Sequence, residues 1–236
     1  NAINITGTTA QIKAALVTAE TLVVAGAATA AISDGVVDIL ATDLSAIGGK
    51  TAGAVTAANA INITGTTAQI KAALVTTDTL VVAGAATAAI SDAEDTDILA
   101  TDLSAIGGKT AGIVTATNAI NITGSGTEVK AALVDTDTLV VAEAATVVIS
   151  GNPSITNLNS IAAKTNGAVT ATLAATDATT LSNIDTASTD IITATINDGI
   201  GTDIAATALL AIGGKTGGIV TAANAINIEG TTTQIK

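Results

Sequence analysis

The chain has 236 residues and a net charge of −12, from 20 acidic residues against 8 lysines. It contains no Arg, His, Cys, Met, Phe, Tyr or Trp. Such a chain has no basic track for nucleic acid or an anionic membrane surface, and no Cys for disulfides or thiolate chemistry. It also has no imidazole for proton transfer, and no apolar run of about 20 residues to cross a membrane. We therefore expect neither an enzyme, a nucleic-acid-binding protein nor a membrane-inserted one.

An internal repeat begins at the first residue. Residues 59–75 repeat residues 1–17 letter for letter, and the opening Asn-Ala-Ile-Asn-Ile returns at Asn118 and Asn224. A repeat of this kind indicates a stack of like units, each buried against its neighbours. A core without aromatic residues suits thin layers of Ala, Val, Ile and Leu.

Short runs of β-branched residues predict strands at Leu22–Val24, Ile61–Thr64 and Ile219–Thr221. In the second run the alternation places Ile61 and Ile63 on one face and Asn62 on the other.

The spacing of apolar residues predicts helices between these strands. In residues 38–47, Leu40, Leu44 and Ile47 lie at i, i+4 and i+7, and Gly48 follows as a left-handed C-terminal residue. Residues 67–75 predict a second helix, with Thr66 or Thr67 as N-cap. Its inner stripe is Ile70, Ala73 and Leu74. Residues 203–212 predict a third helix, because strong helix formers dominate them.

Each repeat divides into two halves with one order: a short strand, a corner, a second strand and a helix. We therefore predict an α/β solenoid, in which coils of two short parallel strands and one helix stack along an axis. The alternative is an all-β parallel β-helix, in which the helical segments are further strands. The predicted coils form one array: 21–52, 53–78, 79–111, 112–137, 138–166, 167–189 and 190–217, with partial coils at 1–20 and 218–236.

The motif Gly48-Gly-Lys-Thr51 recurs at Gly107 and Gly213, and as Ala162-Ala-Lys-Thr165. A phosphate-binding loop would need a second glycine five residues earlier and a helix after the motif. Here the motif follows a predicted helix. We interpret it as a helix C-terminus and a turn.

The acidic cluster Asp92, Glu94, Asp95 and Asp97 is the candidate metal site. Calcium prefers several oxygen ligands close together, but the cluster lacks the spacing of an EF-hand loop. The competing interpretation is a solvated loop whose carboxylates cap the helix that follows. No other cofactor is expected.

Two rows of polar residues are further candidate functional features. The asparagines of Asn-Ala-Ile-Asn suggest stacked amides, although the intervening coil offers Ala or Thr at matching positions. Threonine pairs such as Thr115 with Thr117, and Thr170 with Thr172, suggest an ice-binding face. Residues 80–83 (Leu-Val-Val-Ala) break that pattern.

Residues 90–115 resemble the Ala/Thr-rich repeats of giant bacterial surface proteins, including those of cyanobacteria. The similarity lies in an Ile-Ser-Asp strand end, an amphipathic helix and an Ile-x-Thr strand. It implies secretion and a structural or adhesive role, and it carries over no functional residue.

Repeats without cap-like sequences predict a longer parent chain or end-to-end stacking of copies. We therefore expect a structural module of an extracellular filament, sheath or giant surface adhesin. Its partners are further copies, end to end or laterally, with surface polysaccharide as another candidate. The alternative is a ligand-binding solenoid that uses a repeated face for glycan, calcium or ice.

Overall fold

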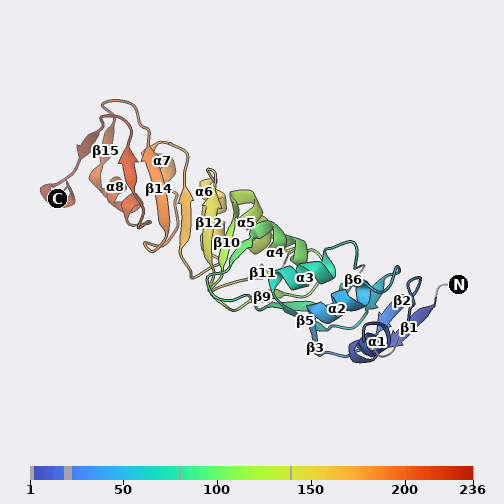
Figure 1. Ribbon diagram of the computed structural model, residues 1–236. Helices are drawn as coiled ribbons and strands as arrows, with labels where there is room; N and C mark the ends of the chain where they lie inside the picture. The colour runs from blue at the N-terminus through green and yellow to red at the C-terminus, as the bar shows by residue number, and fades with distance from the viewer. Residues whose placement is uncertain (1–2, 19–22, 80, 139, 236) are drawn as a thin grey trace.

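The computed structural model describes residues 3–18, 23–79, 81–138 and 140–235. It is an elongated α/β structure with the two chain ends far apart (Figure 1). The strands pair in parallel throughout the described residues, as between β5 and β7 or between β13 and β14. Helices and parallel sheets together confirm the α/β class and exclude the all-β alternative.

Seven of the helices contain eight residues each, whereas α7 and α9 contain four. In the described ranges the helices are α1 (Thr9–Leu16), α2 (Ala41–Gly48), α3 (Thr67–Leu74), α4 (Ala100–Gly107), α5 (Gly126–Leu133), α6 (Ile155–Ala162), α7 (Ala178–Leu181), α8 (Ala206–Gly213) and α9 (Thr232–Ile235).

The strands are two to six residues long. They are β1 (Asn4–Gly7), β2 (Thr29–Ile32), β3 (Asp38–Leu40), β4 (Val55–Ala57), β5 (Asn62–Gly65), β6 (Val81–Val82), β7 (Thr87–Ile90), β8 (Asp97–Leu99), β9 (Val114–Ala116), β10 (Asn121–Ser125), β11 (Val140–Val141), β12 (Thr146–Ser150), β13 (Val169–Thr172), β14 (Ile191–Ile196), β15 (Asp203–Ala205), β16 (Val220–Ala222) and β17 (Asn227–Glu229).

These strands form sheets that follow one another along the molecule. Their strand orders are β1-β2-β4-β6, β3-β5-β7-β9-β11, β8-β10-β12-β13-β14-β16 and β15-β17. Paired residues in neighbouring strands, such as Asn62 and Thr87, are 25 positions apart in sequence. The chain therefore returns to the same sheet about once every predicted coil.

The number of strands between consecutive helices varies along the chain. Strands β4 and β5 lie between α2 and α3, whereas β6, β7 and β8 lie between α3 and α4. Strand β7 pairs with β5 and β9 in one sheet. The third strand, β8, is the first strand of the next sheet, where it pairs with β10. The prediction of two strands per helix is therefore wrong for residues 79–111. It is also wrong for 167–189, where β13 alone precedes α7.

Two predicted helices begin later than the sequence pattern indicated. Residues 38–40 form β3, which pairs with β5, and α2 begins only at Ala41. Leu40 is therefore the 56% exposed residue before the helix, while Leu44 and Ile47 are buried. Residues 203–205 likewise form β15, and α8 follows from Ala206. In the first segment the outward Leu40 of β3 stands four residues before Leu44 and so imitates the spacing of a helical stripe.

The predicted left-handed end of the first of these helices is wrong. Gly48 is the last residue of α2, and the following Gly49 has a φ of −67°. Glycine is required at position 48 for a different reason. A Cβ there would lie 2.2 Å from the carbonyl oxygen of Thr79, so the helix end and the next loop approach backbone to backbone.

Helix α3 confirms its prediction. The Thr66 side chain accepts a hydrogen bond from the Gln69 amide, and the Gln69 side chain accepts one from the Thr66 amide at 2.9 Å. This reciprocal capping satisfies two N–H groups that the helix itself leaves without partners. Ile70, Ala73 and Leu74 are buried as the inner stripe.

The other strand predictions are confirmed in part. Ile61 and Ile63 are buried and Asn62 is partly exposed, as the alternation indicated. Strand β16 lies one residue later than the predicted run at 219–221. Of the run at 22–24, Leu22 lies outside the described residues, and Val23 and Val24 are not in a strand.

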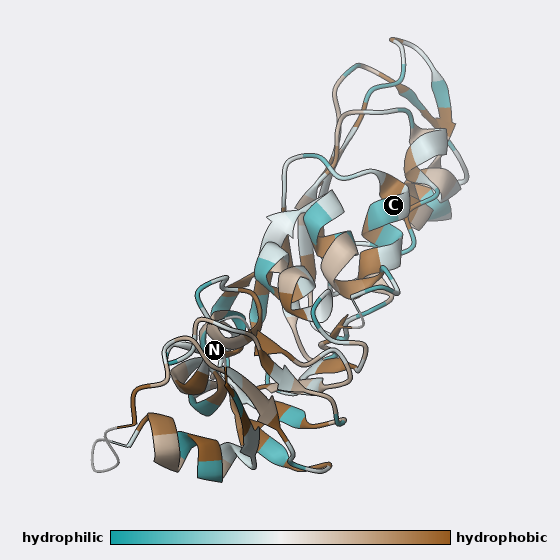
Figure 2. Cartoon of the chain, turned by 90° about the vertical axis from the view of Figure 1, so that its right-hand side faces the viewer, coloured by the Kyte–Doolittle hydropathy of each residue, from teal (hydrophilic) through white to brown (hydrophobic). Residues whose placement is uncertain are grey.

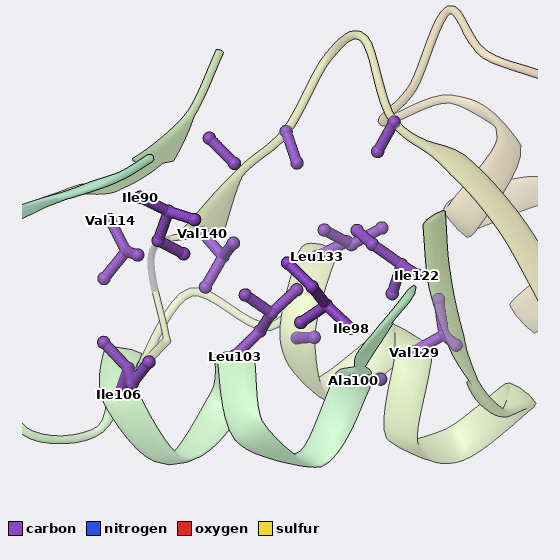
Figure 3. Packing of buried hydrophobic residues seen from close by; sticks show 14 of the residues in the cluster. Ile90, Ile98, Ala100, Leu103, Ile106, Val114, Ile122, Val129, Leu133 and Val140 are labelled. Carbon is purple, nitrogen blue, oxygen red and sulfur yellow. The ribbon is translucent and has the colours of Figure 1, made fainter. Parts of the chain in front are cut away.

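The core is a continuous aliphatic layer between the sheets and the helices. Figure 3 shows Leu103 and Ile106 of α4 pointing toward Ile98, Val114 and Val140 of the strands. Hydrophobic segments occur along the whole length of the molecule (Figure 2). Burying each such side chain contributes roughly 1.5–3 kcal/mol, so stability is distributed among neighbouring layers.

Candidate functional site

Asp92, Glu94 and Asp95 of the acidic cluster lie in the loop between β7 and β8, and Asp97 is the first residue of β8. Asp92 is directed toward α3, the helix that precedes the loop in sequence. Its Oδ2 accepts hydrogen bonds from the Thr67 amide at 2.6 Å and from the Thr67 hydroxyl at 2.7 Å. The prediction that the loop caps the following helix is wrong for Asp92, because the N-terminus of α3 lies beside it.

The other carboxylates of the cluster have different surroundings. Asp97 Oδ1 accepts a hydrogen bond from Asn121 Nδ2 at 3.2 Å, and the Asp95 carbonyl accepts from the same nitrogen at 3.1 Å. Asp95 has a φ of 61°, in the left-handed region that Asp tolerates. Glu94 is exposed, and no hydrogen bond of its side chain is found among the described residues.

The four acidic residues do not converge on one point. Within the described ranges, no group of three or more acidic side chains is arranged to hold a metal ion. Asp92 and Asp97 instead link neighbouring parts of the chain. Calcium binding by this loop stays a prediction.

The Asp92 contact recurs along the chain. Asp34 Oδ2 accepts from the Thr9 amide at 2.6 Å, and Asp198 Oδ2 accepts from the Ala178 amide at 2.8 Å. A carboxylate at a helix N-terminus is favoured by the helix dipole and by the free N–H groups there. The carboxylate 20 to 25 positions later therefore caps each of α1, α3 and α7.

An asparagine side chain donates a hydrogen bond to the backbone of each of these acidic loops. The side-chain amides of Asn59, Asn118 and Asn224 donate to the carbonyls of Asp34, Asp92 and Asp198 at 2.6, 2.6 and 2.7 Å. The repeated asparagine that opens each unit therefore connects it to the preceding acidic loop. Sequence reasoning identified the asparagine and the aspartate separately, but not their pairing.

We expect Asp92→Ala to lower the free energy of unfolding by about 1–2 kcal/mol, because α3 loses a charge-assisted cap. Glu94→Ala is the matched control in the same loop and should change the stability by less than about 0.5 kcal/mol. Urea denaturation followed by circular dichroism measures both. Equal effects of the two substitutions would show that Asp92 does not act as a cap.

Polar side chains on neighbouring strands form hydrogen-bonded rows, called polar rungs here, at the second asparagine of each repeat. Thr87 Oγ1 donates to Asn62 Oδ1 at 3.0 Å, and Asn62 Nδ2 donates to Asp38 Oδ1 at 2.8 Å. Asn121 makes the equivalent contacts with Thr146 and Asp97. The ladder is therefore a mixed series of Asp, Asn and Thr. It is not an unbroken row of amides, as the threonine at the matching position indicated.

The Gly-Gly-Lys-Thr motif lies at the C-termini of α2, α4 and α8, which confirms the prediction that it follows a helix. Thr51 and Thr110 are buried, and their hydroxyls donate to the Gly53 and Gly112 carbonyls at 3.1 Å each. The motif therefore closes a turn, and its position after a helix does not match a phosphate-binding loop.

The outward residues of the strands form rows along the sheets. One row in the five-strand sheet contains Leu40, Thr64, Ala89, Thr115 and Val141 in consecutive strands. Threonine thus alternates with an aliphatic residue, and no member of the row is charged. Thr172 lies beside Thr193 in β14, and Thr170 lies beside Ile191. Ice binding by these threonines stays a prediction.

Ion pairs join neighbouring helices on the outside. Lys13 of α1 pairs with Asp43 of α2, and Lys71 of α3 pairs with Asp102 of α4 at 2.5 Å. Lys215 Nζ lies 2.8 Å from Asp185 Oδ1, and the hydrogen bond and the charge of Lys215 lower the pKa of the Asp185 carboxyl.

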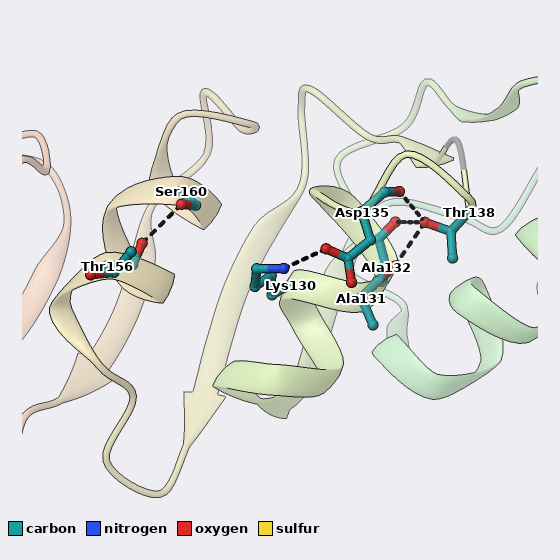
Figure 4. A network of polar contacts seen from close by, with 7 residues as sticks. All are labelled: Lys130, Ala131, Ala132, Asp135, Thr138, Thr156 and Ser160. Carbon is teal, nitrogen blue, oxygen red and sulfur yellow. Dashed lines mark hydrogen bonds and ion pairs between the residues drawn. The ribbon is translucent and has the colours of Figure 1, made fainter.

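The pairing changes between α5 and α6. In α6, Asn157 stands where α2 and α4 have aspartate, and Lys130 pairs with Asp135 at the end of its own helix. Figure 4 shows this pair beside Thr138, whose hydroxyl donates to the Ala131 and Asp135 carbonyls at 2.7 and 2.8 Å. Thr138 thereby closes the C-terminus of α5.

A surface groove of about 520 Å³ lies beside the ends of α5 and α6. Leu133, Val140 and Val141 form its apolar side, and Glu143 and Lys164 form its charged side. It combines the small aliphatic side chains of the repeat with single charges.

No helix in the described part of the chain is long and apolar enough to span a membrane. No family model, curated protein or solved structure matches the chain.

Proposed function

We propose that the chain is an α/β solenoid that serves as a structural module of an extracellular filament, sheath or giant surface adhesin. Its coils stack along one axis, and each end receives a further coil of the same kind. That coil belongs either to another copy or to more of the same polypeptide. The composition and the resemblance to bacterial surface repeats support a location at the cell surface.

The repeated contact between consecutive coils is the observation that carries this proposal. Asp34, Asp92 and Asp198 each cap a helix of the preceding turn of the chain. Parallel strand pairs and ion pairs join the same neighbours. Interactions of this kind stabilise a unit only through the units beside it, as expected for an array that extends by addition.

The surface chemistry supports a structural role over catalysis. Asp34, Asp92 and Asp198 accept hydrogen bonds from a neighbouring turn, and Glu128 and Asp177 cap their own helices. The lysines Lys13, Lys71, Lys130 and Lys215 are engaged in ion pairs. The partners that this arrangement favours are therefore further copies of the chain. Surface polysaccharide is a second candidate partner for the outer faces.

Negative-stain electron microscopy of the purified 236-residue chain over a concentration series tests the proposal. We expect rods of constant width whose mean length rises with protein concentration. Sedimentation velocity should show the matching series of oligomers. Compact particles of one size at every concentration would contradict the proposal.

A further inference from the structure

Resting on the proposed function, we infer that two copies join head to tail through β17 of one copy and β1 of the next. In the assigned register Asn227 lies beside Asn4, Ile228 beside Ile5, and Glu229 beside Thr6. Strands β1 and β17 are each the outer strand of their sheet among the described residues. The chain would thus continue across the junction with parallel pairing.

The direction of the polar rungs supports this junction. In each rung the later strand donates and the earlier strand accepts, as from Thr87 to Asn62 and from Asn62 to Asp38. Asn227 Nδ2 donates to Asp203 Oδ1 at 2.9 Å, and within the described residues its own Oδ1 accepts no hydrogen bond.

Asn4 has the complementary arrangement. Its Oδ1 accepts from the Thr29 hydroxyl at 3.0 Å, while its Nδ2 donates to none of the described residues. A head-to-tail contact lets Asn4 Nδ2 donate to Asn227 Oδ1. The rung then runs without interruption from Thr29 of one copy to Asp203 of the other, with every donor facing an acceptor.

Apolar packing supports the same register. Ile63 and Ile122 are fully buried, whereas Ile228 at the equivalent repeat position is 48% exposed. The register places Ile5, which packs at the edge of the core, over Ile228. Isoleucine over isoleucine already occurs within the chain, where Ile39 pairs with Ile63 and Ile98 with Ile122. The layer across the junction therefore matches layers that the fold already contains.

Charge and symmetry are also compatible with the contact. The outward pair is Glu229 with Thr6, so no like charges face each other across the strands. Because the two edges differ, the contact is heterologous. Repeating it produces an open fibre and not a closed dimer.

A strand exchange is the competing arrangement. Residues 4–12 and 227–235 have nearly the same sequence, so β1 of a second copy could displace β17. Thr6 would then lie beside Ala205, the present partner of Glu229. The two arrangements therefore predict different neighbours for Thr6.

Disulfide trapping in this cysteine-free chain distinguishes them. A chain carrying Thr6→Cys and Glu229→Cys is oxidised under conditions where microscopy shows rods, and the products are separated on a non-reducing gel. Adjacent strand positions satisfy the Cα separation of a disulfide, about 4.4–6.8 Å. We expect a ladder of covalent multimers.

The matched control carries Ala31→Cys with Glu229→Cys, because Ala31 lies one strand further from the junction than Thr6. It should give monomer. A ladder from Thr6→Cys with Ala205→Cys, and none from the first pair, would overturn the inference in favour of exchange. Rods that none of the pairs can trap would also overturn it while leaving the proposed function intact. Absence of rods would instead contradict the proposed function.

Asn4→Asp provides a second measurement without cysteines. It replaces the Asn4 Nδ2 donor with an acceptor facing Asn227 Oδ1, and should raise the concentration needed for assembly on the order of tenfold. Asn62→Asp, which makes the same substitution in the equivalent rung of Asp38, Asn62 and Thr87 far from the junction, controls for a loss of fold stability. Equal assembly by wild type and Asn4→Asp would contradict the assigned rung.

Discussion

Gly107→Ala is expected to lower the free energy of unfolding by about 2–3 kcal/mol. A Cβ at this position would lie 2.0 Å from the carbonyl oxygen of Thr138. Backbone atoms occupy the space, and Thr138 is itself held by its hydrogen bonds to the end of α5. The methyl group can therefore be accommodated only by separating α4 from the loop that follows α5.

The control for this substitution is Gly213→Ala. Gly213 ends α8 as Gly107 ends α4, but apart from its chain neighbours and its own helix backbone, no heavy atom of the described residues lies within 4 Å of its added Cβ. There the higher helix propensity of alanine should leave the stability unchanged or raise it by up to about 1 kcal/mol. Urea denaturation followed by circular dichroism measures both variants. Similar effects at the two positions would contradict a role of Gly107 in backbone contact.

Ile122→Ala is expected to cost about 2–5 kcal/mol, because it leaves a cavity in a closely packed layer. Ile122 is fully buried between Ile98 and Val147 of the neighbouring strands. A layer of branched aliphatic residues has no large side chain nearby that could move into the space. Hydrogen exchange of the amides in β8, β10 and β12 would report the loss where it occurs.

The repeat supplies the matched variant, Ile228→Ala. Ile228 occupies the same repeat position but is about half exposed, so its truncation should cost clearly less in the isolated chain. Under conditions of assembly, the same variant should form fewer rods. If both truncations cost the same in the isolated chain, the burial of this layer does not control stability.

The local features of the fold could be predicted from the sequence. The cap at Thr66 and the inner stripe of α3 depend on residues within one helix. The faces of Ile61, Asn62 and Ile63 depend only on alternation within one strand. These patterns lie within about ten consecutive residues, so a single stretch of sequence contains all the information that they need.

The errors concern contacts between distant residues. Residues 38–40 become a strand because β5 lies beside them, and Gly48 is needed because the Thr79 backbone approaches it. Asp92 caps α3 because a turn of 25 residues returns it to that helix. None of these neighbours can be identified before the pairing of the strands is known.

The position of Asp92 after α3 has a consequence for the order of folding. A chain that is synthesised or secreted from its N-terminus exposes residues 67–74 before the carboxylate that completes them. Helix α3 reaches its final stability only after a further 25 residues have emerged. Native structure therefore advances along the growing polypeptide about one turn behind its leading end, and each new segment completes the one made before it.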